Sequence, residues 1–130
     1  MIKTLTINDE SAIGKMLNQI ILEVERDAIT IEELIIKRVE KEVEDYNKSL
    51  PEYFKGLVQP SETEQVLNGI QIKRKEIDAE KQVYVALRAF QENGFFILVD
   101  NRQVENLNEL ILIEPSMTIS FVKLTALVGG

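Results

Sequence analysis

Few reactive groups are available in this chain. It contains no cysteine and no histidine, so it lacks thiolate nucleophiles, disulfides, the commonest general base and the most frequent zinc ligands. The most credible reactive group that remains is the terminal carboxylate of Gly130, which follows Gly129. A carboxylate is a poor acyl donor at neutral pH, so an ATP-dependent enzyme must adenylate it before transfer. We therefore predict no catalytic residue, metal site or cofactor here, and expect the chain to be the substrate of an activating enzyme.

The two terminal glycines suit a tail that enters the active site of another protein. Glycine lacks a Cβ, so its backbone can pass close to the walls of a narrow channel and adopt unusual dihedral angles. Leu127 and Val128 precede the glycines and would supply apolar contacts to the activating enzyme. The plainer interpretation is a frayed chain end without a role. For the two glycines taken alone, that plainer interpretation is the better one. The functional interpretation gains from their place after a predicted strand, at the end of the ordered pattern of strands and helices described below.

The charged side chains indicate ordinary surface rather than chemistry. Helical spacing spreads four neighbouring carboxylates among lysines, so we interpret them as a solvated face and not as a metal or acid–base site. They are Glu40, Glu42, Glu44 and Asp45. The basic residues 73–75 (KRK) are likewise interpreted as surface charge.

The composition sets the class of protein. A length of 130 residues suits one domain, expected over residues 1–130, and an apolar fraction of 45% is typical of a soluble globular protein. The net charge of −7 argues against nucleic-acid binding, which depends on a basic face. No apolar run approaches the roughly twenty residues of a membrane span, and the first residues lack the layout of a signal peptide. We expect a cytoplasmic protein without membrane or nucleic-acid partners.

The first part of the chain predicts a hairpin followed by a helix. Residues 2–7 and 17–25 have strand character, residues 8–11 (NDES) are turn-prone, and Ile20, Leu22 and Val24 should share one face. Thr30 and Glu33 form a capping-box pattern that starts a helix, which should run to about Asn47 or Lys48. Its expected inward residues are Ile31, Leu34, Ile35, Val39, Val43 and Tyr46; its expected outward residues are Lys37, Arg38, Glu40, Lys41, Glu44 and Asp45.

The second part predicts another helix, another hairpin and a last strand. Residues 50–77 are punctuated by proline and glycine and read as an ordered insertion. Asp78 should cap a helix that runs to about Glu92 and stops at Asn93-Gly94. The expected strands are 95–99 and 102–104 around an Asp-Asn turn, then 117 to about 124 after an ambiguous stretch at 106–114.

Short segments of the chain resemble ubiquitin, in the same order. Residues 21–25 (ILEVE) resemble its strand "ITLEVE", and residues 29–34 (ITIEEL) resemble "DTIENV", where its helix begins. Residues 97–104 (ILVDNRQV) resemble "LIFAGKQL", and residues 117–122 (MTISFV) resemble "STLHLV", the strand before its diglycine. The collinear order of these segments, rather than any one of them, makes the chain similar to the ubiquitin-like β-grasp family.

The resemblance covers about residues 1–48 and 94–130. It implies an α+β fold of the β-grasp class, in which a mixed sheet packs on a helix. The helix-containing insertion at about residues 49–93 lies between the main helix and the third strand, and has no counterpart in ubiquitin. A flexible tail is expected over about residues 125–130.

The resemblance also implies a function, that of a bacterial ubiquitin-like protein modifier. The Gly130 carboxylate would be adenylated, passed to a catalytic cysteine and joined by an isopeptide bond to an amine of a target. The implied partners are an activating enzyme, a conjugating enzyme, an isopeptidase and the target proteins. Ubiquitin recognises partners through the exposed face of the matching strand, so Leu98, Val122 and Leu124 are candidates for an apolar docking patch. A register shift of one residue would turn these side chains into the core.

Two other functions fit the same residues. Residues 125–128 (TALV) are apolar where ubiquitin has arginines, and resemble the "PPVAGG"-like ends of sulfur carriers, whose adenylate becomes a thiocarboxylate. The long insertion weighs against a minimal sulfur carrier. A β-grasp interaction module that is never activated is the third hypothesis.

Overall fold

The computed structural model describes residues 2–49 and 78–123. Strands β1 (Lys3–Ser11) and β2 (Met16–Val24) form the predicted antiparallel hairpin. Residues 8–11, predicted as a turn, instead extend β1, because residues 8–10 pair with β2 on one side and all four pair with a later strand on the other. The turn follows at residues 12–15, where Gly14 adopts a φ of 85° that favours glycine.

A short strand, β3 (Ala28–Thr30), leads into helix α1 (Ile31–Ser49). The predicted capping box is confirmed: the Glu33 N–H donates to Thr30 Oγ1 at 3.1 Å, and the Thr30 N–H donates to Glu33 Oε1 at 3.0 Å. The six residues predicted to face inward are all buried. The prediction that Arg38 and Glu42 face water is wrong, because both are buried against the sheet and paired there with ionic partners.

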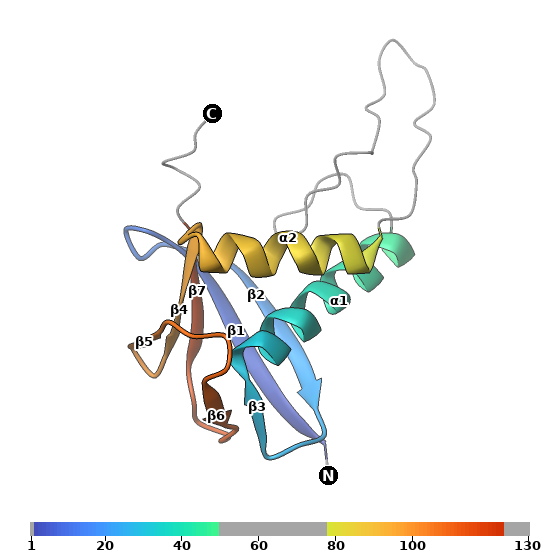
Figure 1. Ribbon diagram of the computed structural model, residues 1–130. Helices are drawn as coiled ribbons and strands as arrows, with labels where there is room; N and C mark the ends of the chain where they lie inside the picture. Colours follow the sequence, from blue (N-terminus) through green and yellow to red (C-terminus); the bar gives the residue numbers. More distant parts are fainter. Residues whose placement is uncertain (1, 50–77, 124–130) are drawn as a thin grey trace, which may run out of the picture.

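Helix α2 (Ala79–Gln91) confirms the second predicted helix. The Asp78 side chain accepts the Glu80 N–H at 3.0 Å and caps its start. At its end, Asn93 has a φ of 62°, and the Gly94 N–H donates to the Ala89 carbonyl at 2.7 Å. This is a Schellman-type stop, with asparagine in the left-handed position. Helix α2 packs across α1 (Figure 1).

Strands β4 (Phe95–Val99) and β5 (Arg102–Val104) confirm the second hairpin. Both residues of its turn, Asp100 and Asn101, have positive φ, as a two-residue hairpin turn requires. The ambiguous stretch contains β6 (Leu110–Leu112), which pairs with β3 in a separate two-stranded sheet.

The last strand, β7 (Ile119–Lys123), begins two residues later than predicted. Thr118 lies outside the strand; its N–H donates to the Asp100 side chain at 2.8 Å and its carbonyl accepts the Asp100 N–H. These bonds fasten the start of β7 to the β4–β5 turn.

The other five strands form one mixed sheet in the order β2-β1-β7-β4-β5. Strand β7 lies at its centre, parallel to β1 and antiparallel to β4. Helix α1 covers one face, and the apolar core fills the space between them (Figure 1). The predicted α+β class, with a mixed sheet packed on a helix, is confirmed. No helix in the described ranges is both long and apolar enough to cross a membrane.

Candidate functional site

The described chain ends where the candidate tail begins. Leu124 and the tail residues Leu127, Val128, Gly129 and Gly130 lie outside the described residues, as do residues 50–77 with their basic triplet. Lys123, the last residue of β7, is placed between Ser11 of β1 and Phe95 of β4. The base of the tail is therefore the end of a central strand with neighbours on both sides.

A buried ionic cluster lies at this end of β7. It consists of Asp9 on β1, Arg38 and Glu42 on α1, and Lys123. The two terminal nitrogens of Arg38 donate to the two carboxylate oxygens of Asp9, and Arg38 Nη2 also donates to Glu42 Oε1 at 3.0 Å. Lys123 Nζ lies 3.6 Å from Asp9 Oδ2. The cluster therefore joins the first strand, the main helix and the last strand.

The cluster places two acidic and two basic side chains together in an almost fully buried site. Arg38 and Asp9 are 0% exposed, Glu42 2% and Lys123 7%. Burial alone would lower the pKa of Arg38, but the hydrogen bonds that Arg38 donates to Asp9 and the charges of both carboxylates outweigh it and raise that pKa. The pKa of Lys123 is lowered, mainly by burial and partly by the Arg38 charge. The Arg38 guanidinium also stacks 4.6 Å from the centre of the Phe121 ring.

Sequence reasoning missed this cluster because it assigned charged residues to the surface by type. Two signals in the sequence point to it. Asp9 continues the buried alternation of Leu5 and Ile7 along β1, and Arg38 follows Leu34 by four residues on the buried row of α1. A charged residue on an otherwise apolar row predicts a buried partner of opposite charge.

The candidate docking patch lies on the opposite face of the sheet. Phe96 is the cross-strand partner of Val122, and Leu98 is that of Ser120. Leu98 and Val122 therefore share the face away from α1, and both are half-buried. Phe96 belongs to the same face as its partner Val122. The structure thus adds Phe96 to the two described members of the predicted patch.

Polar groups border this patch. On the same face the Ser120 hydroxyl donates to Glu10 Oε2 at 2.7 Å, which links β7 to β1.

The predicted acidic face on α1 is correct for Glu44, which is exposed and pairs with Lys48 at 2.9 Å. Within residues 2–49 and 78–123, no three carboxylate side chains are grouped so that they could hold a metal ion.

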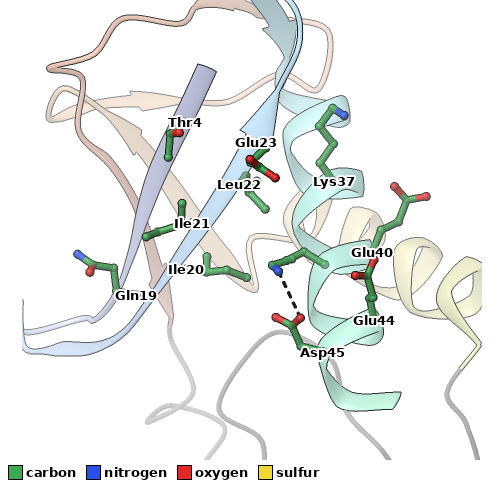
Figure 2. Close-up of a pocket in the computed structure, with 11 residues that line it drawn as sticks. Thr4, Gln19, Ile20, Ile21, Leu22, Glu23, Lys37, Glu40, Glu44 and Asp45 are labelled. Atoms are coloured by element: carbon green, nitrogen blue, oxygen red, sulfur yellow. Dashed lines mark ion pairs between the residues drawn. The ribbon is translucent and has the colours of Figure 1, made fainter. Parts of the chain in front are cut away.

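A groove of about 720 Å³ runs between the β2 edge of the sheet and helix α1 (Figure 2). Its lining combines Ile20, Ile21 and Leu22 with charged side chains of α1. It shares no lining residue with the ionic cluster or with the docking patch.

The sequence matches no protein-family model, and neither the curated proteins nor the solved structures contain a match to this chain.

Proposed function

We propose that this chain is a β-grasp protein modifier of the ubiquitin-like type, activated by adenylation of the Gly130 carboxylate and then conjugated to target proteins. A partner enzyme binds ATP, forms the adenylate with release of pyrophosphate, and supplies the cysteine that displaces AMP, since the chain has no cysteine of its own. The chain acts as the acyl group that is transferred.

The arrangement of β7 is the observation that carries the proposal. The order of hairpin, helix, hairpin and last strand agrees with a β-grasp fold, and β7 runs parallel to β1 at the centre of the sheet. A tail that continues from a central strand starts from a fixed point, because Lys123 is paired with residues of two neighbouring strands. Such a base supports presentation of Gly130 to a second protein.

The docking patch supports the same proposal. An enzyme that takes the tail also needs a surface on the folded domain, and apolar side chains on an open sheet face supply one. Phe96, Leu98 and Val122 are such side chains, and Val122 lies one residue before the end of β7. A partner bound there would lie close to the base of the tail.

The proposal is tested by a search for adducts in cells of the source organism. An N-terminally tagged chain should give tagged species of higher mass that survive denaturation and reduction. Trypsin cleaves after Lys123, so each modified lysine should carry the remnant 124–130 (LTALVGG), which mass spectrometry identifies. Persistence of the adducts after deletion of Gly130 would overturn the proposal.

Sulfur transfer is the second candidate, favoured by the apolar residues 125–128. In that case the adenylate is attacked by a sulfide donor, AMP leaves, and the terminal carboxylate becomes a thiocarboxylate. The intact protein purified from its own cells would then be heavier by the difference between sulfur and oxygen. If this mass change were found and no lysine carried the remnant, sulfur transfer would replace conjugation as the proposed function.

A further inference from the structure

The small sheet of β3 and β6 has one covered face and one open face. Ile29 and Ile111 are cross-strand partners, and both are buried in the core. Since side chains alternate along a strand, their neighbours point the other way. On that outer face Leu110 is 61% exposed and Leu112 is 64% exposed. With their cross-strand partners they form the four residues of what we call the ribbon face: Ala28, Thr30, Leu110 and Leu112.

The two leucines make the ribbon face an apolar surface. Single exposed apolar side chains are common on proteins, whereas neighbouring ones on one face indicate a site of interaction. Leu110 and Leu112 stand about 7 Å apart along β6, and they are among the most exposed large apolar side chains of the described residues. A partner that covered them would remove from water the apolar surface that the folded chain leaves open.

The surplus charge around the ribbon face is negative. Three ion pairs flank the face, and each uses one basic side chain: Lys3–Asp27, Arg26–Glu33 and Arg102–Glu109. Three further carboxylates lie within three residues of β3 or β6 in the sequence, and within residues 2–49 and 78–123 none of them takes part in an ion pair: Glu25, Glu32 and Glu114. These carboxylates remain available to a cationic partner.

The dimensions of the ribbon face suit a helix better than an added strand. Two paired strands lie about 4.8 Å apart, so the face with its side chains is about 10 Å wide, which is the diameter of one α-helix. Strand addition depends on a row of free N–H and C=O groups, but β6 has only three residues. A helix laid along the ribbon would place its apolar stripe on both leucines.

We propose that the ribbon face binds a cationic amphipathic helix of a partner protein. The apolar stripe of that helix covers Leu110 and Leu112, and lysine or arginine side chains beside the stripe meet Glu32 and Glu114. The same charges speed association through long-range attraction. A second copy of the chain is less suitable, because two acidic surroundings would face each other in chains that each carry a charge of −7.

The ribbon face lies at the end of the sheet opposite the base of the tail (Figure 1). Lys3 Nζ donates to the Ile113 carbonyl at 3.4 Å, which places the end of β6 beside the start of β1. Ser11, at the other end of β1, is the partner of Lys123. The eight residues between Lys3 and Ser11 span about 26 Å. A partner on the ribbon face therefore leaves the tail accessible, and its binding does not depend on activation of Gly130.

Synthetic helices test the proposal on the full-length chain. The probe is a peptide of about five helical turns, with leucines at helical spacing on one face and lysines on the other. Its acidic twin keeps the leucines and has glutamate in place of lysine. In ¹⁵N spectra the lysine probe should shift the amides of β3, β6 and the first turn of α1, and the acidic twin should not bind. Equal binding of the twins, or shifts centred on other elements, would overturn the proposal.

Removal of the two leucines tests the apolar part of the site. Leu110→Thr together with Leu112→Thr keeps residues that favour strands and should weaken the lysine probe at least about tenfold. The matched control is Tyr84→Gln with Val85→Gln, which removes two exposed apolar side chains from α2. That control should keep the affinity within about threefold. An equal loss in both variants would refute the assignment to the ribbon face.

Neutralisation of carboxylates tests the charged part. Glu32→Gln with Glu114→Gln should weaken the lysine probe at least about threefold, and the effect should shrink at high salt. Glu40→Gln with Glu80→Gln makes the same change in net charge at two exposed positions outside β3 and β6, and it should change the affinity less than about twofold. If both pairs weaken the probe equally, net charge rather than the ribbon face attracts it.

Two further measurements complete the test. A mass by light scattering that doubles with concentration, and returns to the monomer in the variant Leu110→Thr with Leu112→Thr, would assign the face to a second copy instead. Deletion of Gly130 should leave the affinity for the lysine probe unchanged, which separates this site from the chemistry of the tail. Circular dichroism of each variant confirms that folding is retained before affinities are compared.

Discussion

At the scale of single residues, the buried ionic cluster is the least expected feature. Removing four charged groups from water costs several kcal/mol per ion, which is recovered only when every group has partners of good geometry. Arg38 meets this condition through two-pronged contact with Asp9, a further bond to Glu42 and the Phe121 ring beneath it. We expect the cluster to select one position of α1 over the sheet, because a shift of the helix would leave buried charges without their partners.

The cluster predicts a strong and specific effect of Arg38→Met. The change leaves the buried carboxylates of Asp9 and Glu42 without the guanidinium that pairs with both, so it should lower the free energy of unfolding by about 3–5 kcal/mol. Urea denaturation followed by circular dichroism measures the loss. The matched control Arg88→Met removes an exposed pair with Glu92 and should cost less than about 1 kcal/mol. A similar, small loss in both variants would contradict the role given to Arg38.

The capping box at the start of α1 predicts a pH effect. The hydrogen bond from Arg26, followed by that from the Thr30 N–H, lowers the pKa of Glu33 from 4.5 to about 2. Since the folded-state pKa lies below the unfolded value, the stability that Glu33 contributes is complete above pH 4.5 and is lost as the pH falls toward 2.

This shift can be measured by an NMR titration of the Glu33 carboxyl carbon. In Arg26→Ala the pKa should rise toward 4.5, because the largest cause of the shift is removed. Arg88→Ala, a distant arginine on α2, should leave the Glu33 titration unchanged. A Glu33 pKa that does not respond to loss of Arg26 would show that the cap alone lowers it.

At the scale of elements, the C-terminal stop of α2 depends on Asn93. Its φ of 62° is a conformation that costs most residues roughly 1–2 kcal/mol, and asparagine less. Asn93→Ala should therefore destabilise the protein by about 1 kcal/mol, whereas Asn93→Gly should be neutral or stabilising by up to about 1 kcal/mol. Thermal unfolding of the two variants compares them directly, and a stabilising alanine would contradict the Schellman-type stop.

The elements that sequence could predict are those determined locally. The Thr30–Glu33 cap, the Asp78 cap and the Asp100-Asn101 turn each act over a few residues, and all three are as predicted. The predicted turn at residues 8–11 was wrong because their strand conformation comes from pairing with β7, more than a hundred residues later. Strand β6 was ambiguous for the same reason, since its partner β3 lies far away in the chain.

The same distinction between local and long-range determinants applies to the candidate site. The tail glycines and the apolar residue Leu98 can be read from the sequence. The register that places Phe96 opposite Val122 cannot, because it depends on the pairing of β4 with β7. The ionic cluster needs three elements to meet, so no single segment predicts it. The structure supplied the faces and the partners, while the sequence supplied the candidate residues.

At the scale of the whole molecule, β7 joins two halves that are otherwise separate in the sheet. The β1–β2 hairpin lies on one side of it and the β4–β5 hairpin on the other. The tail therefore starts from the strand that connects the two hairpins in the sheet. We expect the two hairpins to unfold in one cooperative transition, because neither keeps its central neighbour when β7 is lost.

Phe121→Ala tests this dependence. Phe121 is fully buried on β7, stacks on Phe95 with ring centres 5.5 Å apart and carries the Arg38 guanidinium. Its loss should cost about 3–5 kcal/mol, and native-state hydrogen exchange should accelerate in β1 and β4 by the same factor. Phe96→Ala, half-buried on the other face, is the control and should cost less, since that side chain is already partly in water. Protection that persists in one hairpin and disappears in the other would show that the halves fold independently of β7.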